Sequence, residues 1–160
     1  MSALLRPHRE VVRPDWVDYN KHLNDAFYLV IFSHATDHMM DQIGLDAAGR
    51  ERSKHSLFTA ELHLNYLKEV KVGVEVRVET TFLGHDAKRL HIFHTMYVGD
   101  GIEPVATNEQ MQLSMDMTGP KVSPFQPDVL AAIEKIAAEH AKLPRPAQAG
   151  RAIALPPKRG

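Results

Sequence analysis

The residues best suited to chemistry stand close together between Asp18 and Asp25 (DYNKHLND). Asp18 offers a carboxylate that can act as a base or a nucleophile, and His22 offers an imidazole. The segment ends on Asn24 and Asp25, two residue types that cap helices by accepting hydrogen bonds from free backbone N–H groups. The unpaired donors of a helix N-terminus can polarise a carbonyl oxygen. The segment therefore predicts a site for acyl transfer.

A long helix is predicted directly after this segment, from Ala26 to Ile43, with Asn24 or Asp25 as its N-cap. Its apolar residues recur near the helical period and leave little polar face, which is typical of a buried helix. Gly44 favours an end just beyond Ile43. At ~1.5 Å per residue the helix is roughly 30 Å long, so it can cross a small domain.

The rest of the chain predicts an antiparallel sheet. The neighbourhood of Val11 to Val17 indicates a short edge strand, because Pro14 would interrupt a central strand. Asp46 to Lys54 is polar and indicates a loop. Four extended segments follow, joined by tight turns that predict a meander: Ser56 to Leu67, Val72 to Leu83, Arg89 to Val98 and Glu103 to Met117. A buried helix on such a sheet gives an α+β sandwich.

A second amphipathic helix is predicted to open at Pro127 and to stop before Pro144. Its apolar face consists of Val129, Ile133, Ile136 and His140. We expect one domain over residues 1–142 and an extended tail over residues 143–160, with Ile153 and Leu155 docked on the body.

Composition excludes several classes of function. The 160 residues suit one domain, and 19 Lys and Arg against 20 Asp and Glu argue against a dedicated nucleic-acid surface. With no cysteine there is no disulfide framework and no thiolate nucleophile, which is compatible with the cytoplasmic location that we expect. No apolar run suggests a secretory signal or a membrane span.

The order of strand, buried helix and four antiparallel strands resembles the hotdog fold. The residues Asp18, His22, Leu23, Asn24, Ala26 and Tyr28 resemble the entrance motif of the 4-hydroxybenzoyl-CoA thioesterase-like family, roughly Asp-x-x-Gly-His-Val-Asn-Asn-x-x-Tyr. This resemblance implies that Asp18 is catalytic and that the backbone N–H of Asp25 polarises the thioester of an acyl-CoA substrate. It implies no metal and no cofactor. Lys21 and Asp25 replace the usual Gly and Asn of the motif.

A narrower resemblance is carried by five short segments: residues 16–20, 64–68, 88–91, 106–111 and 150–153. They are similar to the betainyl-CoA thioesterases of carnitine breakdown, including the thioesterase domain fused to some carnitine dehydrogenases. The reaction that this resemblance implies is hydrolysis of betainyl-CoA to glycine betaine and coenzyme A.

Substrate-binding residues follow as expectations. Glycine betaine bears a quaternary ammonium, which aromatic faces bind, so Trp16 and Tyr19 are candidates for a cage with Glu109 as acidic neighbour. Packing is the alternative role for a lone Trp. Lys68 and Arg89 are candidates for the phosphates of coenzyme A, although charged residues at strand ends are also ordinary solvated termini.

Other interpretations stay open at this point. His22 could orient Asp18, contact the thioester, or only bind backbone. His34 and His38 lie one turn apart, a spacing that can hold a metal, but packing is expected because the glutamate of an HExxH motif is missing. Rival functions are a hotdog hydratase or dehydratase and a non-catalytic acyl-CoA-binding module. The resemblance implies a homodimer or homotetramer, which would also cover the edges of the sheet.

Overall fold

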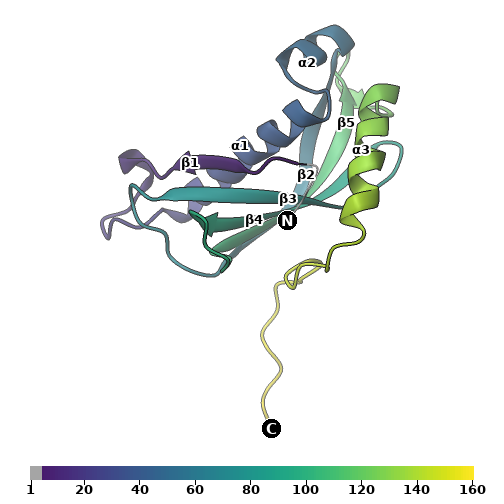
Figure 1. The fold of residues 1–160 in the computed structure, drawn as a ribbon. Helices are drawn as coiled ribbons and strands as arrows, with labels where there is room; N and C mark the ends of the chain where they lie inside the picture. The colour runs from purple at the N-terminus through teal and green to yellow at the C-terminus, as the bar shows by residue number, and fades with distance from the viewer. Residues whose placement is uncertain (1–4) are drawn as a thin grey trace.

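A curled antiparallel sheet lies against one long helix in the structure, a computed structural model that describes residues 5–160 (Figure 1). The elements in chain order are β1 (His8–Val11), the short 3-10 helix η1 (Pro14–Trp16), α1 (Asp25–Gln42), α2 (Ala47–Ser53), β2 (His55–Tyr66), β3 (Glu75–His85), β4 (Arg89–Val98), β5 (Ala106–Asp116), β6 (Lys121–Val122) and α3 (Pro127–His140). The predicted α+β class is confirmed.

Helix α1 forms where the sequence predicts it, and Asn24 is its N-cap. The Asn24 side chain accepts a hydrogen bond from the N–H of Ala26 at 3.1 Å, which satisfies one of the free donors of the first turn. Gly44 follows the helix at a φ of +93°, a backbone angle that glycine adopts without a steric penalty. The buried side chains are Tyr28, Ile31, Phe32, Ala35, Thr36, Met39 and Met40.

The sheet order is β1-β3-β4-β5-β2, with every pairing antiparallel. Strands β3, β4 and β5 form the predicted meander. The prediction that β2 pairs with β3 is wrong, because β2 pairs with β5. The reason lies in residues 67–74, which do not make a hairpin turn. The backbone of residues 70–74 bonds instead to residues 12–23, and the segment therefore crosses over beside the N-terminus of α1.

Three further predictions need correction. Strand β1 begins at His8, earlier than expected, and Pro14 lies in η1. The expected loop after α1 contains helix α2, whose N-cap Asp46 accepts a hydrogen bond from the Gly49 N–H at 2.8 Å. In the tail, Ile153 and Leu155 are 91% and 94% exposed, so they are not docked on the body.

Helix α3 buries the predicted face of Val129, Ile133, Ile136 and His140. Val129 and Ile133 share one core cluster with Met39 of α1 and with Ile43, the C-cap of that helix. A second core cluster surrounds the N-terminal half of α1 and includes Trp16, Tyr28 and Phe32. In the described part of the chain, no helix is both long and apolar enough to cross a bilayer.

A buried histidine connects α1 to the sheet. The two ring nitrogens of His94 bond to the hydroxyls of Thr36, at 2.9 Å, and of Thr80, at 2.8 Å. Burial lowers the pKa of His94 to about 3, with a smaller contribution from His8. The imidazole is therefore neutral at physiological pH. Its bond to Thr36 joins α1 to the sheet, and its bond to Thr80 joins β4 to β3.

We predict that this histidine makes stability fall in mild acid. An unfolded histidine titrates near 6.5, so between pH 6.5 and 3 the unfolded state binds the extra proton and the free energy of unfolding decreases as the pH falls. The slope is about 1.4 kcal/mol per pH unit for such a group. Denaturant unfolding of His94→Gln between pH 7 and 5 should show a smaller slope than wild type. The exposed His85→Gln is the control; an unchanged slope in His94→Gln would contradict this role.

Candidate active site

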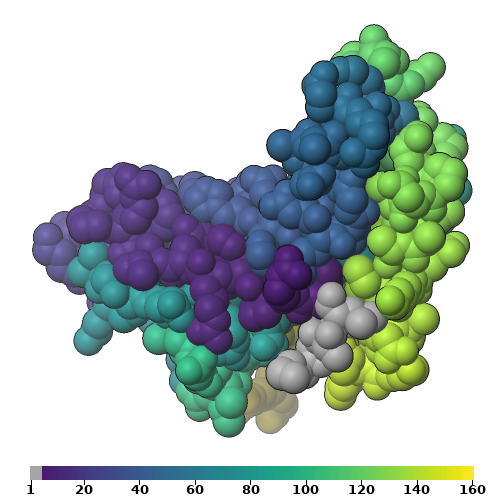
Figure 2. Space-filling model, turned by 45° about the horizontal axis from the view of Figure 1, so that its top comes forward, coloured from purple at the N-terminus to yellow at the C-terminus, as the bar shows by residue number. Residues whose placement is uncertain are grey.

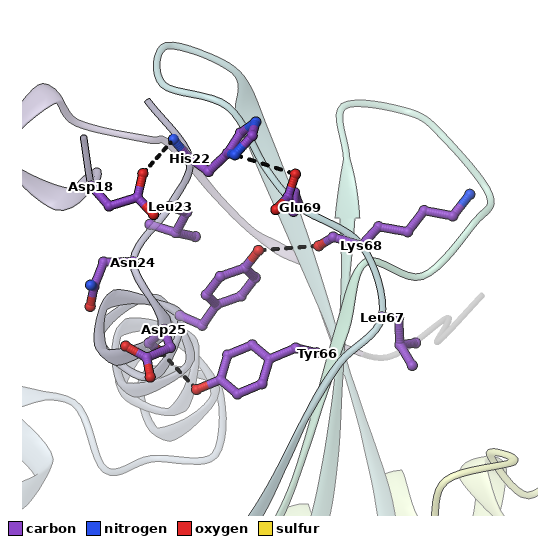
Figure 3. Close-up of a pocket in the computed structure, with 10 residues that line it drawn as sticks. Asp18, His22, Leu23, Asn24, Asp25, Tyr66, Leu67, Lys68 and Glu69 are labelled. Carbon is purple, nitrogen blue, oxygen red and sulfur yellow. Dashed lines mark hydrogen bonds and ion pairs between the residues drawn. The ribbon is translucent and has the colours of Figure 1, made fainter. Parts of the chain in front are cut away.

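A cavity of about 400 Å³ opens at the N-terminus of α1 (Figure 3). Its walls come from the loop before α1, from the first turn of α1, and from the crossover that follows β2. The lining residues are Asp18, His22, Leu23, Asn24, Asp25, Tyr28, Tyr66, Leu67, Lys68 and Glu69. The structure thus brings together the four predicted catalytic residues and Lys68, and the volume lies within the usual range for small-molecule sites.

The Asp18 carboxylate is held by its own loop. Its Oδ1 atom accepts hydrogen bonds from the backbone N–H groups of Asn20, at 2.8 Å, and His22, at 3.3 Å. The turn closes through the Lys21 N–H, which donates to the Asp18 carbonyl at 3.0 Å. Among residues 5–160, no hydrogen bond reaches the second carboxylate oxygen, Oδ2. Oδ1 therefore holds the Asp18 carboxylate in place, and Oδ2 remains available to act as a base or a nucleophile.

His22 positions Asp18 through its backbone rather than its ring. Its N–H donates to Asp18, while ring atom Nδ1 lies 3.3 Å from a carboxylate oxygen of Glu69 (Figure 3). Glu69 belongs to the crossover, and its side chain is 77% exposed. The ring therefore links the loop before α1 to the crossover segment.

The first residue of α1 lines the same cavity. Asp25 is the first residue of the helix, where an N–H has no acceptor within the helix. The carbonyl of Asp25 accepts a hydrogen bond from the Tyr66 hydroxyl at 2.9 Å (Figure 3). Burial and, to a smaller extent, the Asp25 carboxylate raise the pKa of Tyr66, so the hydroxyl stays a donor at neutral pH. Tyr66 thereby fixes the helix start against strand β2.

Tyr66 was not among the predicted site residues. It lies within one of the five segments that carry the narrower resemblance, which is the signal that could have found it. Its ring meets the Tyr28 ring edge-on, with centroids 5.1 Å apart. The Tyr28 hydroxyl in turn donates to the Lys68 carbonyl at 3.1 Å. The two tyrosines therefore hold the crossover against α1 and form the aromatic wall of the cavity.

The predicted cage of Trp16 and Tyr19 does not form in this structure. Trp16 is only 6% exposed and stacks on Phe27 at an interplanar angle of 17°, so its role is packing. Tyr19 is 91% exposed. Neither residue lines the cavity at the helix start. Sequence proximity to Asp18 suggested a shared site, but η1 turns the Trp16 side chain into the core.

The two basic residues expected to bind phosphate are occupied by ion pairs. Lys68 contributes to the cavity wall, but its amine extends away from the cavity and pairs with Glu103 (Figure 3). Arg89 pairs with Asp86, whose carboxyl pKa the guanidinium lowers to about 2. Arg89 stands opposite Leu113 of β5, whereas Tyr66 stands opposite Ala106. At ~3.3 Å per strand residue, Arg89 is roughly 20 Å from the cavity.

Glu109 occupies a separate cavity of about 250 Å³. It accepts hydrogen bonds from His91 Nε2 and from the backbone N–H of Gly150, both at 2.7 Å. Its neighbour Gln110 bonds to Thr36 of α1, and successive strand side chains point to opposite faces of a sheet. Glu109 therefore faces away from α1, on the side where the tail crosses the sheet.

The arrangement at the helix start can carry out acyl transfer. A carbonyl oxygen placed at the Asp25 N–H would be polarised by the helix N-terminus, and the Asp18 carboxylate lines the same cavity. These roles for Asp18, Asp25, His22 and Asn24 stay predictions, because geometry alone does not test them.

Comparison with known proteins identifies the family. The profile of the thioesterase-like superfamily matches residues 12–133. The chain belongs to this superfamily. The match includes the whole loop from Asp18 to Asp25, the crossover and strands β2 to β6, so the predicted family is confirmed.

Similar proteins support the same assignment. A betainyl-CoA thioesterase of Pseudomonas aeruginosa is 52% identical over 159 residues, covering 99% of this chain and all of that protein. An L-carnitine dehydrogenase/betainyl-CoA thioesterase of Agrobacterium fabrum is 40% identical over 94% of this chain, which spans only 31% of that longer protein. A Staphylococcus aureus structure in complex with CoA has a TM-score of 0.87 at 31% identity, covering 94% of both chains. The predicted hotdog fold and thioester hydrolase class are confirmed.

We predict that position 21 controls the shape of the Asp18 loop. Lys21 has a φ of +63°, a left-handed conformation that costs about 1–2 kcal/mol for a residue with a side chain. The loop therefore keeps the backbone that glycine would favour. Lys21→Gly removes this cost, so it should be at least as stable as wild type and should keep the thioesterase activity. Lys21→Val should lose about 1 kcal/mol or more of unfolding free energy, because a β-branched residue tolerates this region least, and should also lose activity.

The control for this experiment is Lys71→Val, at a position that pairs with His22 and lacks a positive φ. Denaturant unfolding and acyl-CoA hydrolysis are measured for all three variants. Wild-type stability in Lys21→Val would show that the backbone angle does not constrain the loop.

Proposed function

We propose that the protein hydrolyses betainyl-CoA to glycine betaine and coenzyme A, a step of carnitine degradation. The observation that carries the proposal is the 52% identity to the Pseudomonas betainyl-CoA thioesterase along the whole length of both chains. Proteins of Agrobacterium fabrum, Ruegeria pomeroyi and Rhizobium meliloti that are each named L-carnitine dehydrogenase/betainyl-CoA thioesterase support the same substrate. We also propose a cytoplasmic location, as expected from the sequence.

The proposed mechanism uses the two groups at the helix start. The thioester carbonyl oxygen accepts a hydrogen bond from the Asp25 N–H, which stabilises the negative charge that develops on that oxygen. Asp18 then takes a proton from a water that attacks the carbonyl carbon, or attacks it directly to form an anhydride that water opens. In both routes the C–S bond breaks, coenzyme A leaves as the thiol, and the acyl group leaves as a carboxylate.

The charges of the cavity suit a cationic acyl group. Asp18, Asp25 and Glu69 line it, whereas the amine of Lys68 is paired with Glu103 outside it. Tyr66 is half-exposed and presents an aromatic ring at the same wall. Acidic and aromatic groups together attract a quaternary ammonium, at about 0.5–2 kcal/mol for each good aromatic contact. We therefore transfer the cage role from Trp16 and Tyr19 to Tyr66 with its acidic neighbours.

The assembly that we propose is a homodimer through β2, which can associate further into a tetramer. Strand β2 is 12 residues long and lies at one edge of the sheet, whereas the opposite edge strand, β1, has four residues. Exposed apolar side chains follow β2 and its end: Phe58, Leu62, Tyr66 and Leu67. A long exposed apolar edge strand invites pairing, and a two-fold dimer would place the cavity of each chain near its partner.

Thiol release from a panel of acyl-CoAs tests the proposed activity. The panel contains betainyl-CoA with acetyl-, longer straight-chain and aromatic acyl-CoA, and a thiol-reactive dye reports free CoA without background because the protein has no cysteine. We expect preference for betainyl-CoA and a loss of about 10²–10⁴-fold in kcat for Asp18→Asn. Asp15→Asn, an exposed aspartate paired with Arg13, is the matched control and should retain activity.

Hydrolysis of another acyl-CoA, but not of betainyl-CoA, would contradict the proposed substrate. If no acyl-CoA of the panel is hydrolysed and Asp18→Asn binds acyl-CoA as wild type does, the enzymatic function is rejected and an acyl-CoA-binding module is favoured. Hydration of an unsaturated acyl-CoA, detected as loss of its conjugated absorbance, would favour the hydratase.

The proposed dimer makes its own prediction. Phe58→Lys places a charge on the β2 edge, where pairing would bury it, and should lower the molar mass in solution measured by light scattering. Val11→Lys, at a 52% exposed position on β1, is the control and should leave the mass unchanged. Loss of assembly in the control alone would place the interface at the other edge.

A further inference from the structure

A second cluster of chemically active side chains lies outside the cavity, between β1 and α1. His8 and Glu10 are two residues apart on β1, so they share one face of the strand. That face meets His34 of α1, and in Figure 2 the purple segment that contains β1 lies alongside the blue α1 helix. At ~1.5 Å per residue, His34 is roughly 13 Å along the helix from Asp25, so the cluster is separate from the acyl-transfer site.

The donor atoms of the three side chains converge on one point. His8 Nε2 lies 2.9 Å from Glu10 Oε1, and His34 Nδ1 lies 2.8 Å from the same oxygen. All three ligand atoms are within 4.8 Å of one another. Bonds of about 2.0–2.2 Å to a tetrahedral zinc ion put its ligand atoms roughly 3.3 Å apart. To form a tridentate site, the two nitrogen–oxygen distances would lengthen by about half an ångström, and the two nitrogens, now within 4.8 Å of each other, would approach this spacing.

We propose that His8, Glu10 and His34 bind one divalent transition-metal ion of the zinc type. Two imidazoles and one carboxylate are a ligand set that zinc uses elsewhere, and imidazole favours Zn²⁺, Ni²⁺ and Co²⁺ over Mg²⁺ and Ca²⁺. The Glu10 carboxylate supplies one negative charge against the two of the ion. The His34 side chain is 43% exposed, which leaves a path for the ion and space for a water as fourth ligand.

His38 provides an independent observation at the same place. It follows His34 by one helical turn, and its ring centroid lies 5.7 Å from that of His8. Its Nε2 atom is buried and has no hydrogen-bond partner among the described residues. A buried polar atom without a partner is unusual and calls for an ion or a water. A water bound to the metal ion would donate the hydrogen bond that this atom lacks among the described residues.

Metal binding at this position would hold β1 against α1. The ligands come from an edge strand with four residues and from the central helix, which are also joined near this seam by hydrogen bonds between Arg6 and Gln42. An ion that binds the folded chain only stabilises it by mass action. The sequence favoured simple packing for His34 and His38 because the glutamate of an HExxH motif is missing; His8 and Glu10 reach His34 only through the fold.

The test uses untagged protein treated with EDTA and then dialysed. We expect calorimetric titration with Zn²⁺ to show one ion per chain, Co²⁺ to give the intense visible bands of a tetrahedral site, and Zn²⁺ to raise the melting temperature by several degrees. Glu10→Gln and His34→Gln should each weaken binding about tenfold or more and abolish the thermal shift. His85→Gln, an exposed histidine elsewhere, is the control and should bind as wild type does.

Each outcome decides the proposal. Glu10→Gln keeps the shape and an acceptor oxygen, and circular dichroism establishes that both variants fold. Absence of saturable Zn²⁺ and Co²⁺ binding in wild type would show that the cluster is only a hydrogen-bonded triad. Equal affinity in wild type, Glu10→Gln and His34→Gln would place the ion elsewhere and also overturn the proposal.

Discussion

Backbone hydrogen bonds between the crossover and the loop before α1 determine the position of the candidate active site. The N–H of Leu23 donates to the Val70 carbonyl at 2.7 Å, and the N–H of Val72 donates to the Lys21 carbonyl at 3.1 Å. These bonds place residues 66–69 beside the helix start and thereby complete the cavity. They also explain why β2 pairs with β5: a chain that must cross the helix entrance cannot turn back as a hairpin to β3.

Helix α1 serves two purposes along its length. Its first residue, Asp25, lines the cavity, where a free backbone donor is useful for binding an oxyanion. Its middle and end are anchored by apolar packing and by the link through Thr36 and His94, which fixes the helix against the sheet. A rigid helix directs its N-terminal donors to one point. Because the donors are part of the backbone, side-chain changes at Asp25 leave them in place.

The sequence predicts those parts of the molecule that are determined by residues close together in the chain. The period and the cap of α1 and the face of α3 follow from neighbouring residues, and the loop from Asp18 to Asp25 forms one wall of a cavity as expected. Two of the predictions that were wrong depend on distant contacts. The place of β2 depends on the crossover, and the burial of Trp16 depends on Phe27 and the core around it. Tyr66 joins the site only because β2 ends beside the helix start.

The central claim is that one thioester carbonyl binds at the helix start, next to Asp18. Isotope-edited infrared spectroscopy tests it directly, using betainyl-CoA labelled with ¹³C at the carbonyl and bound to the slow Asp18→Asn variant. Polarisation by the Asp25 N–H weakens the C=O bond, so the account predicts that the carbonyl stretch moves to lower wavenumber than in water. A stretch at or above its solution position, with the substrate demonstrably bound, would contradict the account.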